Sequence, residues 1–245
     1  MASEHIIKSY DEELERLNKI IVEMGGLAES QLAAAIEAIV TRDSELAANV
    51  IEGDHKVDQL ERDLDSLAVR LLALRQPMAG DLRQIVAALK IASDLERICD
   101  YCANVAKRSI ALAQSPLTQP SRALQRMGHL ALLLVRDVID AYVARDADKA
   151  IGVWNRDEEL DEMYSSLFRE FLTYMMEDPR NIGAYTHLLF IAKNIERIGD
   201  HATNIAEDLY FMVHGTPLDR VRPKGDRSSL EMVASDRTSG GEAAR

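Results

Sequence analysis

Apolar residues recur three and four positions apart along most of the chain, which is the spacing of one face of an α-helix. Strict alternation of apolar and polar residues, which is typical of strands, is absent from the sequence. The pattern therefore predicts an all-α protein. The clearest run is Ile91, Leu95, Ile98, Cys102 and Val105, and it recurs as Ile191, Ile195, Ile198, Ala202, Ile205 and Leu209.

The pattern predicts six long helices, the first of them interrupted near Gly25-Gly26, because glycine is a poor helix former. Asp43 and Asp146 precede the second and fifth helices and are candidate N-caps, since an aspartate side chain accepts hydrogen bonds from the first helical turn. Ser121 is a third candidate N-cap. The predicted ranges are 4–40, 43–75, 80–113, 121–144, 147–177 and 181–213.

The chain contains an internal repeat that divides the six helices into two sets of three. Residues 24–58 recur 103 positions later, and residues 95–105 recur 100 positions later. A short bridge with Pro116 and Pro120 separates the halves, and Pro77 and Pro179 break the same point of each half. We therefore expect two tandem, pseudo-symmetric antiparallel three-helix bundles, residues 4–113 and 121–213, followed by a disordered tail over 214–245.

The repeat keeps polar residues as well as apolar ones. Carboxylates spaced at i and i+4 form a stripe along one helix face, and on the apolar pattern this stripe falls outside the core positions. We therefore expect the stripes to face solvent or a neighbouring surface. The repeated residues are Asp54, Asp58, Glu96, Arg97, Asp100 and Asn104 in the first half, and Asp157, Asp161, Glu196, Arg197, Asp200 and Asn204 in the second.

Carboxylate pairs at this spacing destabilise an isolated helix by about 0.2–0.5 kcal/mol each, so their repetition suggests a compensating cation or basic side chain. Oxygen donors suit hard cations such as magnesium, calcium or manganese, and clustered carboxylates also bridge iron. The alternative is a solvated charged face in which Arg97 and Arg197 act as ion-pair partners. The spacing alone leaves both interpretations open.

Two shorter motifs have simpler explanations. Cys99 and Cys102 form a C-x-x-C, but the motif lies inside a predicted helix and is not repeated, so we interpret it as packing. Glu52 and His55 have the Glu-x-x-His spacing of di-iron helical bundles, but the second half lacks the histidine. A di-iron enzyme is therefore disfavoured.

The composition narrows the class of partner. A formal net charge of −12 disfavours direct binding to nucleic acid or to an anionic membrane surface. The N-terminus lacks the pattern of a signal peptide, and no apolar run approaches the roughly 20 residues that span a bilayer. With only two cysteines, the chain is typical of a reducing compartment, and we expect it in the cytoplasm.

Two three-helix units, each with Asp-x-x-x-Asp followed by Glu-Arg-Ile-x-Asp-x-x-x-Asn, resemble the PhoU family of phosphate-specific transport system accessory proteins. The resemblance covers about residues 4–213. It implies a non-enzymatic negative regulator of the phosphate-starvation response and of high-affinity phosphate uptake. The implied partners are the ATPase of the phosphate ABC transporter and a PhoR-type sensor histidine kinase, with membranes reached only through them, and a homodimer is implied as well.

The resemblance also implies multinuclear metal clusters, of iron or zinc and in some cases magnesium or manganese. Arg97, Asn104, Arg197 and Asn204 would support these clusters. A metal-free helical adaptor unrelated to phosphate remains the alternative, ahead of a di-iron enzyme. The implied metal ligands are Asp54, Asp58, Glu96, Asp100, Asp157, Asp161, Glu196 and Asp200.

Overall fold

The computed structural model describes residues 2–115 and 122–219, with side chains from residue 10 onward. These residues form six α-helices and no strand, which confirms the all-α prediction, and every predicted helix end lies within two residues of the observed one. The helices are α1 (Ala2–Thr41), α2 (Ser44–Arg75), α3 (Ala79–Ala113), α4 (Arg122–Ala144), α5 (Ala147–Glu177) and α6 (Ile182–His214), with a 3₁₀ turn η1 (Pro179–Asn181) before α6.

The turns between the first and second helices of the two halves have the same geometry. Arg42 (φ 57°) and Arg145 (φ 52°) both adopt the left-handed conformation, and each is followed by an aspartate cap. The Asp43 side chain accepts hydrogen bonds from two backbone N–H groups of the α2 first turn, and Asp146 accepts one from the Lys149 N–H. Both predicted N-caps are confirmed.

The C-terminal end of α6 is closed by a glycine. Gly215 adopts the left-handed conformation (φ 77°), and its N–H donates to the Phe211 carbonyl at 2.8 Å. His214 is the last helical residue, one residue beyond the predicted helix end and inside the predicted tail. The predicted cap Ser121 and residues 220–245 of the predicted tail lie outside the described residues.

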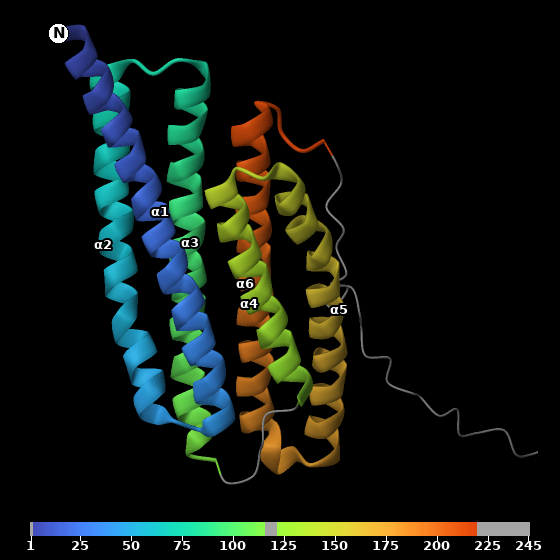
Figure 1. Ribbon diagram of the computed structural model, residues 1–245. Coiled ribbons are helices and arrows are strands. Elements are labelled where there is room, and N and C mark those ends of the chain that lie inside the picture. Colours follow the sequence, from blue (N-terminus) through green and yellow to red (C-terminus); the bar gives the residue numbers. More distant parts are fainter. Residues whose placement is uncertain (1, 116–121, 220–245) are drawn as a thin grey trace, which may run out of the picture.

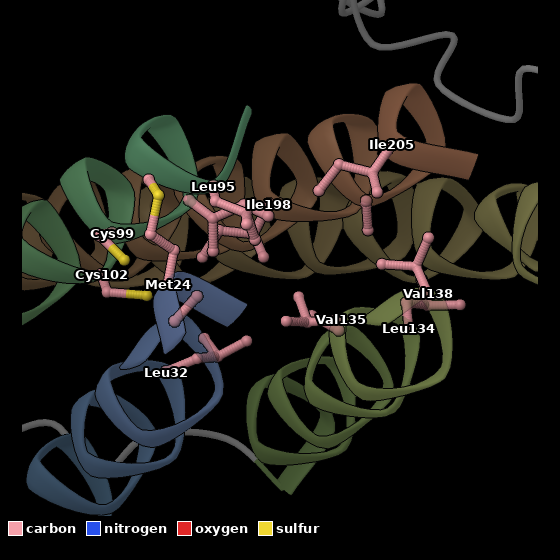
Figure 2. Packing of buried hydrophobic residues seen from close by; sticks show 14 of the residues in the cluster. Met24, Leu32, Leu95, Cys99, Cys102, Leu134, Val135, Val138, Ile198 and Ile205 are labelled. Atoms are coloured by element: carbon pink, nitrogen blue, oxygen red, sulfur yellow. The ribbon is translucent and has the colours of Figure 1, made fainter. Parts of the chain in front are cut away.

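The two three-helix units lie side by side, with α2 and α5 outermost (Figure 1). They meet through α3 against α6 and through α1 against α4. Buried apolar residues from both units form one hydrophobic cluster, so the units share a continuous core. Figure 2 shows part of it, with Met24 and Leu32 (α1), Leu95 (α3), Leu134, Val135 and Val138 (α4), and Ile198 and Ile205 (α6).

The α1–α4 contact has two equivalent halves, each built on a repeated glycine. A Cβ atom at Gly25 would lie 2.8 Å from Ile139 Cδ1, and one at Gly128 would lie 2.9 Å from Ile36 Cγ1. These are the same two repeat positions with the roles of the units exchanged, so the contact is pseudo-two-fold. Glycine is therefore needed for close helix approach, and the predicted interruption of the first helix at Gly25-Gly26 is wrong, since α1 is continuous.

The α3–α6 contact combines the same symmetry with different chemistry on its two sides. On one side the Lys90 Nζ lies 2.9 Å from Asp208 Oδ1. At the equivalent place on the other side, the Arg108 guanidinium lies 4.2 Å from the centre of the Phe190 ring. An ion pair on one side and a cation–π contact on the other distinguish the two units. No helix among the described residues has the length and apolar character to cross a membrane.

Candidate functional site

The carboxylates of the first unit gather between α2 and α3, in a group that we call the first acidic cluster. Asp54, Asp58 and Glu61 come from α2, and Glu96 and Asp100 come from α3; all five are half-buried. Burial, together with the nearby charges of Asp100, Glu61 and Asp58, raises the pKa of Glu96 to about 7 against the opposing effect of Arg97. The cluster therefore concentrates negative charge in a partly desolvated place.

The basic side chains beside this cluster are exposed. Arg97 Nη1 lies 3.1 Å from Asp100 Oδ2 and its Nε lies 3.5 Å from Glu96 Oε2, while 55% of the Arg97 side chain is exposed. Lys107, also exposed, lowers the pKa of Asp54, although burial and Asp100 raise it overall. Asp54 Oδ1 is buried without a hydrogen-bond partner. Exposed ion pairs contribute little, about 0–1 kcal/mol, so this charge is only weakly compensated.

The carboxylates of the second unit, the second acidic cluster, are more deeply placed. Asp157 and Asp161 of α5 and Glu196 of α6 are at most 4% exposed, and Asp200 is half-buried. The second stripe therefore faces a neighbouring surface, one of the two expected surroundings, and not solvent. That surface is α5, which covers this face of α6, where Gly199 carries no side chain and Leu160 fills the space.

A lysine is built into the second acidic cluster. Lys193 Nζ donates to Glu196 Oε1 at 2.8 Å and lies 4.7 Å from the centre of the Tyr164 ring. Burial, together with the charges of Asp200 and Asp161, raises the pKa of Glu196 to about 7 although Lys193 opposes the shift. The other oxygen, Glu196 Oε2, is buried without a hydrogen-bond partner. The negative charge of Glu196 is thus only partly neutralised.

The predicted supporting residues take different positions. Arg97 pairs with its own cluster as described, whereas Asn104 is exposed. Asn204 Nδ2 donates to Asp94 Oδ1 at 3.3 Å, and the Arg197 guanidinium lies 5.6 Å from the centre of the Tyr101 ring. Asn204 and Arg197 therefore contact α3 of the first unit and help to join the two units.

The donor set fits a cation in its chemistry. Among the side chains that the structure describes, residues 10–115 and 122–219, no three from His, Cys, Asp or Glu are already gathered around one metal position. A bound cation would therefore draw together carboxylates that face one another from neighbouring helices. The buried oxygens without hydrogen bonds, Asp54 Oδ1 and Glu196 Oε2, are the atoms that gain most from such a charge.

Sequence reasoning missed three residues of these clusters: Glu61, Tyr164 and Lys193. These residues are not repeated: Tyr164 in the second half corresponds to Glu61 in the first half, and Lys193 corresponds to Ser93. A search for differences at positions beside the repeated carboxylates would have found them.

The two shorter motifs lie beside the first acidic cluster but have simpler explanations. Cys99 and Cys102 are free, fully buried thiols that point into the core beside Met24 (Figure 2). Burial raises the pKa of both thiols, which fits the packing interpretation. Glu52 and His55 are exposed on α2, whereas the Glu-x-x-His of a di-iron bundle projects into the bundle core.

Both units match a known protein family. The family model of the PhoU domain matches residues 21–109 and 124–209, one match for each three-helix unit. The chain belongs to the PhoU family. The repeated carboxylates of both clusters lie inside the matched residues.

Full-length relatives and solved structures agree with this membership. The chain is 53% identical over 225 residues to a Caulobacter vibrioides protein named phosphate-specific transport system accessory protein PhoU homolog, covering 91% of this chain and 98% of the relative. It is 50% identical over 230 residues to a Rhizobium meliloti protein of the same name, covering 94% and 97%. The crystal structure of PhoU from Pseudomonas aeruginosa matches with a TM-score of 0.82 at 40% identity, covering 84% of this chain and all of that one.

Proposed function

We propose that this PhoU-family chain regulates phosphate transport, as a negative regulator of the phosphate-starvation response and of high-affinity phosphate uptake. The observation that carries the proposal is the match of both units to the family, over nearly the whole length of relatives named as accessory proteins of the phosphate-specific transport system. An accessory role is regulatory, so we propose no catalytic activity.

The proposed mechanism is that of an adaptor on the cytoplasmic side of the membrane. One partner is the ATPase of the phosphate ABC transporter, and the other is a PhoR-type sensor histidine kinase, which the adaptor holds inactive when phosphate is plentiful. Two related units that share one core are held at a fixed separation, which suits a protein with two partners. We also propose that the chain forms a homodimer.

The proposal includes metal on both acidic clusters, with iron or zinc as the expected ions and magnesium or manganese as alternatives. In the first cluster Asp54, Asp58, Glu96 and Asp100 would hold the metal, and in the second Asp157, Asp161, Glu196 and Asp200 would do so. When bound, the metal supplies positive charge that neutralises the carboxylates. It would thereby tie α2 to α3 and α5 to α6 and stiffen the surfaces offered to partners.

Metal analysis of the purified protein tests the ligand assignment. The double variant Asp100→Asn, Asp200→Asn should contain less metal than the parent, because each change removes one carboxylate charge at nearly constant size. The exposed Asp63→Asn on α2 is a control of the same chemistry outside the proposed ligands. Unchanged metal content in the double variant would remove Asp100 and Asp200 as ligands.

A phosphate-starvation reporter such as alkaline phosphatase tests the regulatory role. In phosphate-replete cells that lack this chain, reporter activity should be high, and complementation with the chain should suppress it. Normal repression in the cells without the chain would contradict the negative-regulator role and favour a structural adaptor unrelated to phosphate.

A further inference from the structure

The two acidic clusters are built on equivalent positions but differ at two positions that lie one helical turn from their carboxylates. The first cluster has Glu61 where the second has Tyr164, and it has Ser93 where the second has Lys193. The first cluster thus combines five carboxylates, while the second combines four carboxylates with a lysine of its own. Their electrostatic demand for a cation is therefore unequal.

The Lys193 ammonium contacts both Glu196 and Tyr164. Its Nζ donates to Glu196 Oε1 at 2.8 Å and lies over the buried Tyr164 ring at 4.7 Å. The Glu196 side chain is 5% exposed and that of Lys193 is 32% exposed, so solvent screens this pair less than it screens a fully exposed one. Glu196 Oε2, which is buried without a hydrogen bond, leaves part of the charge unmet. The second cluster can therefore still attract a cation, but one of its oxygens is already engaged.

The cations near the first cluster are held less firmly. Arg97 reaches Asp100 and Glu96 from a side chain that is 55% exposed, and Lys107 is exposed as well. Both can swing into solvent at little cost, because exposed ion pairs contribute little to stability. Ser93 is neutral and exposed, so it opposes no incoming cation.

We propose that Lys193 is a built-in competing cation that makes the second acidic cluster the weaker metal site, so that the first cluster fills at lower metal concentration. This inference rests on the metal binding in the proposed function. A divalent ion that reaches Glu196 has to displace the ammonium or bind beside it. Either route weakens binding. Repulsion between the Lys193 ammonium and a divalent ion on the neighbouring carboxylate predicts at least about a tenfold difference in affinity.

Manganese titration of the purified, metal-stripped full chain tests the proposal, with free Mn²⁺ followed by electron paramagnetic resonance. The parent should bind Mn²⁺ in two steps whose affinities differ at least tenfold. Asp100→Asn should weaken the tighter step and Asp200→Asn the weaker one, which assigns the steps to the clusters.

Two further variants change the competing charge. Lys193→Gln should tighten the weaker step by about tenfold or more and leave the tighter step unchanged, because it removes the ammonium from the second cluster. Ser93→Lys should weaken the tighter step, because it places a lysine at the same position of the first cluster. Lys19→Gln, which removes an exposed lysine paired with Glu15, is the matched control and should change neither step.

Circular dichroism and urea denaturation establish that each variant is folded before its titration is compared. Two equal steps in the parent, no binding of Mn²⁺ by the folded parent, or a Lys193→Gln titration identical to the parent would each overturn the proposal. The reporter experiment on starvation signalling does not depend on these titrations. Failure of the regulatory role is therefore distinguishable from failure of this inference.

Discussion

Adjacent glycines on α1 offer a direct test of how the two units are joined. Gly25 is buried, and a Cβ atom there would lie 2.8, 2.9 and 3.0 Å from Cδ1, Cγ1 and Cγ2 of Ile139 on α4. Gly26 is exposed, and a Cβ atom there would meet nothing within 4 Å. Replacement of each glycine by alanine therefore makes the same chemical change in two different surroundings.

The expected free energies follow from these distances. Either change raises intrinsic helix propensity by about 1 kcal/mol, and Gly26→Ala should be stabilised by about that amount. Carbon atoms pack best at about 3.5–4.0 Å, so Gly25→Ala forces Ile139 or all of α4 to move, and overpacking of this kind costs about 1–3 kcal/mol. Gly25→Ala should therefore be less stable than Gly26→Ala by about 1–3 kcal/mol.

Urea denaturation followed by circular dichroism measures both values, provided that the slope of the transition stays constant. Ile139→Ala removes all three crowded atoms, so the double variant Gly25→Ala, Ile139→Ala should show a favourable coupling of at least about 1 kcal/mol. If Gly25→Ala were as stable as Gly26→Ala, or if the coupling were zero, the close α1–α4 approach would be refuted.

Three further predictions concern single side chains. The pKa values of Glu96 and Glu196 are raised from the ordinary 4.5 to about 7, so in chelator-treated protein the folded state binds more protons than the unfolded state between these pH values. The unfolding free energy should therefore fall as pH rises through that window. It should fall less steeply in Glu196→Gln, which has lost one of the two carboxyls. Asp43→Ala should lower the unfolding free energy by about 1 kcal/mol in urea denaturation, because two backbone N–H groups lose their cap. Cys99 and Cys102 should resist a thiol reagent in native protein and react after unfolding, since both are fully buried.

Each of these predictions has an outcome that would contradict it. A flat dependence of stability on pH in the parent would mean that the two carboxyls titrate normally. Equal stability of Asp43→Ala and the parent would show that the cap does not stabilise α2. Stoichiometric labelling of native protein at the rate of an unfolded chain would place the thiols outside the core.

The sequence by itself determined the number of helices, their ends and the division into two related units. These features depend on local chemistry: the helical spacing of apolar residues, the prolines, and the aspartate caps Asp43 and Asp146 act within a few residues of one another. It also identified Asp54, Asp58, Glu96 and Asp100 as repeated carboxylates, because equivalent positions of a duplicated unit can be compared directly.

Only the tertiary structure decided how deeply each cluster is buried and which neighbours it has. The sequence left open whether the stripes face solvent or a neighbouring surface, and Glu196 is buried because α5 lies on this face of α6, with Leu160 against Gly199. Gly25 likewise looked like a helix break until α4 was placed against it. Periodicity within one helix reports the face that the helix turns to the core, whereas contacts between helices distant in the chain depend on how whole faces pack together.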